Sequence, residues 1–249
     1  MRASSIEFRL RMAINAAIII LGFWAPWIEA WGIGRRITLL EWLALQLGRT
    51  GLVSFTVAVP VVISVSALLA AVGAALRILG TAYLGTGTVN SLDMKAGGVM
   101  ADGPYRYLRN PLYLGLWFMV AAMAFIMPVT GALLSLVLIS VFLMRLILAE
   151  EAFLSEQIGE PYKLYVRAVP RIVPRFGTSL PRAGSRAHWL KAVLAELTPI
   201  GVFMSLAFLS WSYDSRLMGR AILIFFGASL VVRALMPQDR AQVSDVRGQ

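Results

Sequence analysis

Long apolar runs alternate with polar segments along the whole 249-residue chain. A helix needs about 20 apolar residues to cross the hydrocarbon core of a bilayer, and several runs have this length or come close to it. The pattern therefore predicts an all-α integral membrane protein with about six transmembrane helices. The predicted spans are residues 13–31, 52–76, 111–127, 132–149, 197–211 and 221–236.

The connections between these runs differ in length and character. Residues 128–131 form a tight turn, so the two spans beside it are expected to make an antiparallel hairpin. Residues 35–49 mix apolar side chains with charges, a pattern typical of a short helix lying at the membrane interface. Residues 77–111 and 150–196 are much longer and polar, and long connections of this kind usually carry function.

Composition supports the membrane assignment and removes several classes of function. The chain is 59% hydrophobic and 14% charged, with a mean hydropathy of +0.75, far from the averages of soluble domains. In so apolar a chain, a net charge of +10 indicates arginines that set topology and contact lipid headgroups, so no nucleic-acid partner is expected. The absence of cysteine and the single histidine, His188, exclude disulfides, a cysteine nucleophile and thiolate or multi-histidine metal centres.

The distribution of positive charge predicts the orientation of the protein. The two long polar segments and the two terminal tails hold 16 of the 23 lysines and arginines, whereas the opposite connections hold five. Because positive charge accumulates on the cytoplasmic side, both termini and the active site are expected to be cytoplasmic, at the plasma membrane if the host is bacterial. The polar segments 77–111 and 150–196 then meet at one membrane face and together can form a pocket.

The segment 103–115, with the sequence GPYRYLRNPLYLG, places polar chemistry at the mouth of a predicted span. Its tyrosines offer faces for stacking and its arginines offer cationic donors, whereas Asn110 supplies both a donor and an acceptor just before Pro111. An adenine-bearing cofactor suits this combination. Taken singly, the same side chains also fit interfacial aromatics and phosphate-binding arginines. The residues concerned are Tyr105, Arg106, Tyr107, Arg109, Asn110 and Tyr113.

Two adjacent carboxylates, Glu150 and Glu151, stand where the fourth predicted span emerges. Charges in this position are costly unless they are solvated or paired, so a cationic ligand is one candidate partner and a nearby arginine is another. Arg145 lies more than a turn deeper in the same span. A charge at that depth is a candidate functional residue, with snorkelling to the interface or a structural ion pair as the alternatives.

These motifs, taken in order, carry a resemblance to a known family. GPYRYLRNPLYLG, then the EE pair one hairpin later, then GEPYKLYVRAVPRIVP resemble the isoprenylcysteine carboxyl methyltransferase family, relatives of the phospholipid N-methyltransferases. The resemblance covers about residues 90–176. It implies three parts: 1–89 with the first two helices, 90–176 as the methyltransferase core, and 177–249 with a basic linker and the last two helices.

The resemblance implies an integral membrane enzyme that binds S-adenosylmethionine at the cytoplasmic face and methylates a lipid-like acceptor in the bilayer. It implies catalytic roles for Arg145 and Glu150. The sequence departs from the family pattern at Asn110, where histidine is common, and in the spacing of Arg145, which stands five residues before Glu150. The implied cofactor-binding residues are Asn90, Gly97, Gly98, Val99, Met100, Gly103, Tyr105, Arg109, Asn110, Pro111, Leu112, Tyr113, Glu150 and Glu151.

The implied reaction is an in-line methyl transfer, in which the protein mainly holds donor and acceptor in line. A carboxylate acceptor needs no base, whereas an amine must first lose a proton, for which Glu150, Glu151 or a tyrosine is a candidate. The acceptor, the oligomeric state and the role of the hairpin 197–236 stay open. The alternatives are a nicotinamide-dependent membrane reductase, a transporter and a non-catalytic scaffold. Binding of S-adenosylhomocysteine rather than NADPH would separate the methyltransferase from the reductase.

Overall fold

A computed structural model describes residues 2–24, 37–85, 102–177 and 184–235, and within these ranges the protein is built from helices alone. One isolated backbone bridge joins Thr38 and Pro128. The elements are α1 (Ser5–Arg9), α2 (Arg11–Phe23), α4 (Leu39–Arg49), α5 (Phe55–Leu84), the 3-10 turn η1 (Gly103–Arg106), α7 (Pro111–Ala124), α8 (Val129–Ile158), α9 (Glu160–Ala168), α10 (Trp189–Ala195), α11 (Leu197–Ser212) and α12 (Ser215–Leu235).

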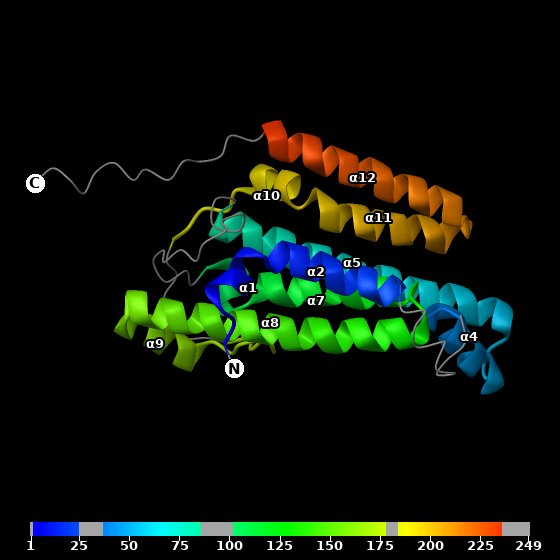
Figure 1. Ribbon diagram of the computed structural model, residues 1–249, viewed down its shortest axis with the longest axis horizontal. Helices are drawn as coiled ribbons and strands as arrows, with labels where there is room; N and C mark the ends of the chain where they lie inside the picture. Colours follow the sequence, from blue (N-terminus) through cyan, green and yellow to red (C-terminus); the bar gives the residue numbers. More distant parts are fainter. Residues whose placement is uncertain (1, 25–36, 86–101, 178–183, 236–249) are drawn as a thin grey trace, which may run out of the picture.

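The long helices run side by side along the long axis of the molecule (Figure 1). Helix α5 packs against α4, α7 and α11, while α8 packs against α2 and α7, and α12 packs against α11. Helices α1, α9 and α10 lie at one end of this array and α4 lies at the other (Figure 1). The polar segments that flank the long helices are therefore concentrated at the end that holds α1, α9 and α10.

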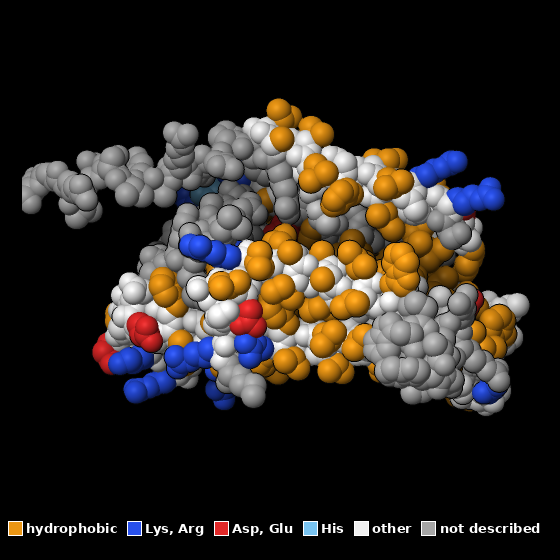
Figure 2. All heavy atoms as spheres, viewed as in Figure 1, with side chains coloured by type: hydrophobic (Ala, Val, Ile, Leu, Met, Phe, Trp, Pro, Cys, Tyr) orange, Lys and Arg blue, Asp and Glu red, His pale blue; other side chains and the backbone are white. Residues whose placement is uncertain are grey.

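Apolar side chains cover the outside of the helix array between its two ends, as Figure 2 shows for one face. On α8, Leu133, Val137 and Val141 are each more than half exposed, and on α12 so are Leu223 and Ile224. Water would make such a surface unfavourable, whereas lipid tails solvate it. Large exposed apolar surface with charges at the ends is the arrangement expected of a membrane protein.

Inside the array, glycines let helices approach closely. A Cβ added to Gly115 of α7 would lie 2.8 Å from the carbonyl oxygen of Gly73 and 2.7 Å from Cγ of Arg77, both on α5. Gly131 of α8 likewise meets the backbone of Gly22 on α2. In a lipid environment such small-residue contacts supply the packing that holds helices together. They bring α7 close to α5 and α8 close to α2.

The number of membrane spans is supported only in part. Helices α5 and α8 have both the length and the composition of a span, and α10 with α11 makes a third if the pair, bent by 66°, counts as one. Helices α2 and α7 are apolar but shorter. The described residues thus support an integral membrane protein with two or three candidate spans, and the predicted six helices stay a prediction.

Two helices extend well past their predicted ends. Helix α5 continues beyond residue 76 to Leu84, because the guanidinium of Arg77 is neutralised within the fold and does not stop the helix. Helix α8 runs to Ile158 and ends at Gly159, whose φ of +74° suits glycine. The predicted interfacial helix is α4, whose Thr38 and Glu41 form a capping box.

Candidate active site

The turn η1 is fixed by contacts on both of its sides. Gly103 has a φ of +54° and lies against the ring of Tyr83, so that a side chain at this position would collide with the ring. Tyr105 is 7% exposed, and its carbonyl oxygen accepts a hydrogen bond of 2.8 Å from the hydroxyl of Tyr165 on α9. Glycine and the buried tyrosine therefore hold the turn against α5 and α9.

The hydroxyl of Tyr105 is buried without a hydrogen-bond partner among the described residues. It lies 3.4 Å from the position that a Cβ on Gly80 would occupy. Burial, with the charge of Glu150 second, raises the pKa of Tyr105 well above its ordinary value, and burial likewise raises the pKa of Tyr165. Both phenols therefore stay protonated near neutral pH, which excludes them as general bases and leaves the Tyr105 hydroxyl available to a ligand.

Asn110 joins the two polar segments that the sequence predicted would meet. It precedes Pro111, which occupies the first turn of α7, where a missing N–H costs nothing. Its amide nitrogen donates to Oε1 of Glu151 at 3.2 Å and to the carbonyl oxygen of Arg171 at 3.1 Å. An amide can donate two hydrogens from one nitrogen, which an imidazole nitrogen cannot. The departure at Asn110 thus has a defined structural role.

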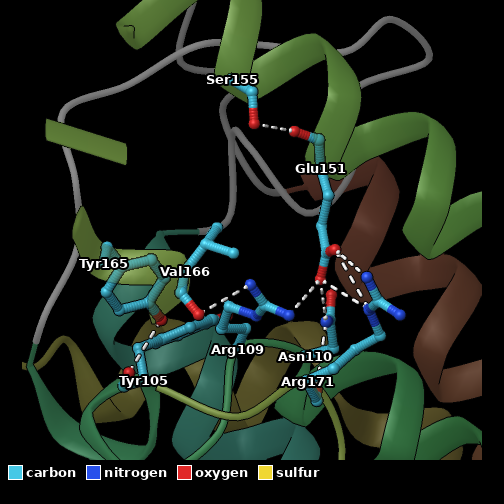
Figure 3. Close-up of polar contacts among 8 residues, drawn as sticks. All are labelled: Tyr105, Arg109, Asn110, Glu151, Ser155, Tyr165, Val166 and Arg171. Carbon is cyan, nitrogen blue, oxygen red and sulfur yellow. Dashed lines mark hydrogen bonds and ion pairs between the residues drawn. The ribbon is translucent and has the colours of Figure 1, made fainter. Parts of the chain in front are cut away.

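Glu151 is the centre of a buried ion cluster (Figure 3). Its carboxylate lies 3.3 Å from Nη2 of Arg109 and 2.8 Å from Nη2 of Arg171, and its side chain is 10% exposed. The guanidinium of Arg109 also donates to the carbonyl oxygen of Val166. Hydrogen bonds to Glu151 raise the pKa of Arg171. Glu151 therefore ties the start of α7 to the chain that follows α9.

Glu150 has a different environment from its neighbour. Its Oε2 accepts a hydrogen bond of 2.8 Å from the hydroxyl of Tyr113 on α7. The ion pairs of Arg109 and Arg171 go to Glu151 rather than to Glu150. One carboxylate is thus paired with two guanidinium groups, whereas the other accepts a hydrogen bond from a neutral phenol and also feels the charge of Arg11. Glu150 is the better placed of the two to bind a cationic ligand.

An apolar pocket of about 300 Å³ opens beside this polar end of the α7–α8 hairpin. Ser140, Leu143, Met144 and Ile147 recur on one face of α8, which continues toward the two glutamates one turn later. Tyr113 lines the pocket and also holds Glu150, so the apolar and polar regions share a side chain. The remaining lining residues are Leu114, Trp117 and Ile172.

Arg145 faces a different neighbour. Its Nη2 binds both carboxylate oxygens of Glu7 on α1 at 2.9 Å, and neither side chain of this pair is fully buried. The backbone adds to the contact, because the N–H of Ala3 donates to the carbonyl oxygen of Arg145. The two predicted catalytic residues therefore contact different helices, Glu150 reaching α7 and Arg145 reaching α1.

The remaining predicted site residues divide into two groups. Gly103, Tyr105, Arg109, Asn110, Pro111, Leu112 and Tyr113 lie at the site end of α5, α7 and α8. Asn90, Gly97, Gly98, Val99 and Met100 lie outside the described residues.

Sequence reasoning missed three participants, since it predicted no role for Arg171, Trp117 or Glu7. Arg171 lies within the third motif, GEPYKLYVRAVPRIVP, and the signal for its role was an arginine-containing motif that follows the EE pair. Trp117 donates to Ser140 at 2.9 Å, and its spacing of four residues from Tyr113 was the signal for a shared face. Glu7 carried no signal, because its partner is 138 residues away.

A comparison with known protein families matches part of the chain. Residues 61–160 match the model of the phospholipid methyltransferase family. This match identifies a methyltransferase. Members of the family use S-adenosylmethionine as methyl donor, and the match supports a membrane enzyme of that type. The matched residues include Asn110, Tyr113, Glu150 and Glu151. No curated protein and no solved structure matches the chain.

Proposed function

We propose that the enzyme transfers a methyl group from S-adenosylmethionine to the polar group of a lipid-like acceptor at the cytoplasmic face of the membrane. One observation carries the proposal: Tyr113 belongs at once to the apolar pocket and to the polar pair with Glu150. A lipid-like acceptor needs such a junction, because its tail must stay in an apolar environment while its headgroup reaches a polar reagent. The family match supports the same reaction.

The residues present fit the cofactor. Its sulfonium and amino groups are cationic, and Glu150 offers a carboxylate that neither Arg109 nor Arg171 neutralises. The unpartnered buried hydroxyl of Tyr105 supplies a further polar contact. When bound, S-adenosylmethionine supplies an already activated methyl group. The chain then has to bind, orient and exclude water, since positioning alone accounts for much of such a rate enhancement.

The acceptor pocket favours a headgroup that tolerates a nearby carboxylate. An amine, as in the phospholipid acceptors that the matched family's name describes, is attracted to Glu150 and can lose its proton to that carboxylate, which Tyr113 holds in place. An isoprenylcysteine-type carboxylate is the second candidate, supported by the order of the three sequence motifs. It needs a cation at the pocket, and Arg145 would have to leave Glu7 to provide one.

Topology supports a cytoplasmic site. Helices α1, α9 and α10, which belong to the basic N-terminal tail and the basic segment 150–196, lie at one end of the array (Figure 1). Under the positive-inside rule this end faces the cytoplasm. We propose six membrane-crossing segments and the division 1–89, 90–176 and 177–249 on the same grounds.

The test combines binding with product identification. The purified protein in nanodiscs is titrated with S-adenosylhomocysteine and, separately, with NADPH, and is then incubated with labelled S-adenosylmethionine and a total lipid extract. We expect binding of S-adenosylhomocysteine and label in an amine-containing lipid. Label in a carboxyl methyl ester would favour the second acceptor, and binding of NADPH alone would replace the proposal by a reductase. A protein that binds neither and labels no lipid would fit a scaffold.

A further inference from the structure

A buried ion pair connects the C-terminal hairpin to the helix behind the site. Nε of Arg77 on α5 lies 2.6 Å from Oε2 of Glu196, and Nη2 of Arg77 lies 3.0 Å from Oε1. Thr81, one turn further along α5, donates to Oε1 of Glu196 at 2.6 Å. The carboxylate therefore receives three hydrogen bonds from one face of α5. Glu196 is 1% exposed, so its carboxylate is shielded from solvent.

Glu196 occupies a special place in the chain. It is both the C-cap residue of α10 and the N-cap residue of α11, where the two helices bend by 66°. It lies outside the residues that match the methyltransferase family, which end at 160. The match therefore assigns no role to Glu196 or to the hairpin that follows it.

The face of α5 held by Glu196 is also the face against which the site is built. The stem of Arg77 packs on Gly115 of α7, two residues from Tyr113. Gly80, which lies between Arg77 and Thr81, faces Leu112 and the unpartnered hydroxyl of Tyr105. A shift of this part of α5 would therefore displace the surface against which Tyr105 and the start of α7 pack.

Contacts on either side of the ion pair extend the same attachment. The N–H of His188 donates to the carbonyl oxygen of Ala82 at 2.9 Å, and the ring of Trp189 meets the ring of Tyr83 edge to face. The N–H of Ser185 donates to the carboxylate of Asp102, the residue before η1. The segment 184–196 thus contacts both α5 and the start of η1, as the position of α10 beside the end of α5 shows (Figure 1).

From these contacts we infer that Glu196 is a positioning residue for methyl transfer, and that the C-terminal hairpin completes the cofactor site rather than only anchoring the enzyme. Glu196 does so by binding Arg77 and Thr81. These two residues fix the part of α5 that contacts Tyr105 and the start of α7. This inference rests on the proposed function. It predicts that cofactor affinity depends on a residue outside the matched domain.

The test measures cofactor affinity and folding separately in the full chain in nanodiscs. Glu196→Gln is expected to raise the dissociation constant of S-adenosylhomocysteine and the KM for S-adenosylmethionine about tenfold, with kcat within about threefold of wild type. The double variant Arg77→Met with Glu196→Met removes both charges, so no lone buried charge destabilises it. It is expected to regain the wild-type unfolding midpoint but not the wild-type affinity, because an apolar pair loses the hydrogen bonds that fix Thr81 and α5.

A matched control uses the opposite end of the same two helices. The hydroxyls of Ser64 on α5 and Ser210 on α11 form a hydrogen bond of 3.3 Å. Replacing both serines by alanine removes a polar contact between the same elements, far from Tyr105. The dissociation constant should then stay within twofold of wild type.

The outcomes distinguish this inference from the proposed function. Failure of the wild-type protein to bind S-adenosylhomocysteine overturns the proposed function and the inference with it. Wild-type affinity in Glu196→Gln, or recovery of both folding and affinity in the double variant, overturns the inference alone. If neither charge variant folds, Thr81→Val decides, since it keeps both charges and removes one hydrogen bond to Glu196; an unchanged dissociation constant there overturns the inference.

Discussion

The α7–α8 hairpin and the α11–α12 hairpin have similar apolar compositions but use their polar residues differently. In α7–α8 a group of polar side chains at one end bind one another, with Tyr113 on Glu150 and Asn110 on Glu151. In α11–α12 the helices share a hydrogen bond between Thr198 and Ser229. The charged residue at the start of that hairpin, Glu196, instead binds α5.

This difference shows that the partner of a charged residue decides its role in an apolar hairpin. A buried charge needs a partner, and the two glutamates have partners in different parts of the chain. Glu151 pairs with arginines from the segments that flank its own hairpin, whereas Glu196 pairs with Arg77 of another helix and attaches its hairpin to that helix. Glu150 accepts its hydrogen bond from the phenol of Tyr113 instead.

The largest expected effect is that of Glu151→Gln. The change leaves Arg109, whose side chain is 7% exposed, without its ionic partner, while Arg171 at 39% exposed finds water more readily. We expect the protein to lose about 2–3 kcal/mol of stability, a small value for a broken buried ion pair, and thermal unfolding in detergent measures this loss. We also expect cofactor binding to be lost, which titration with S-adenosylhomocysteine measures. Glu156→Gln, an exposed position on the same helix, is the control, and equal effects in both variants would contradict the cluster's role.

Next in size is Tyr113→Phe, which removes the hydroxyl that holds Glu150. We expect stability to fall by only about 1 kcal/mol, as for one hydrogen bond, but methyl transfer to fall roughly 10² fold if Glu150 acts on the acceptor. Initial rates at saturating cofactor measure the effect. The control is Tyr107→Phe, which removes the hydroxyl of the tyrosine directly after η1. Its rate should stay close to wild type. Equal rates for Tyr113→Phe and wild type would remove Tyr113 from the reaction.

A third change, Met144→Trp, fills the pocket without touching its polar end. The KM for a lipid acceptor should rise about tenfold, equivalent to about 1.4 kcal/mol, whereas the affinity for S-adenosylhomocysteine should not change. The control is Val141→Trp on the same helix, where the side chain is 57% exposed on the outside of the array. An unchanged KM in Met144→Trp would place the acceptor elsewhere.

A smaller effect is expected from the pair Arg145→Gln and Glu7→Gln. Hydrogen bonds from the backbone N–H of Ser4, and next from Arg145, lower the pKa of Glu7. The contribution of the pair is therefore complete above the ordinary pKa of a glutamate and disappears as pH falls through the lowered value. Because both side chains are partly exposed, each variant should have an unfolding midpoint close to that of wild type at neutral pH. A rate that falls 100-fold in Arg145→Gln but not in Glu7→Gln would instead establish Arg145 as catalytic.

The smallest expected effect belongs to the second hairpin. Ser229→Ala removes the hydrogen bond between α11 and α12, worth about 0.6 kcal/mol on average between membrane helices. Methyl transfer and cofactor affinity should match wild type in a side-by-side assay. A large loss of affinity would show that the whole hairpin, and not Glu196 in particular, supports the site.

Much of this organisation could be predicted from local signals in the sequence. The apolar runs predicted helices, the order GPYRYLRNPLYLG, EE and GEPYKLYVRAVPRIVP indicated a membrane methyltransferase, and the family match supports that reaction. Helix ends were predicted less well, because α5 continues past a charge that the fold neutralises at long range. The number of spans was likewise not settled by hydropathy, since α7 is only 14 residues long.

By itself, then, the sequence determined the class of protein, the helices and the pair of motifs, because hydropathy and short-range spacing are local properties. Only the tertiary structure decided which charge meets which partner. Glu150 and Glu151 are neighbours in sequence, yet one binds Tyr113 and the other binds Arg109 and Arg171. Arg77 and Glu196 lie 119 residues apart, and no local pattern joins them. These pairs depend on how the helices pack, because a buried charge needs a partner and distant segments of the chain supply it. The partner then determines which parts of the fold each charge holds together.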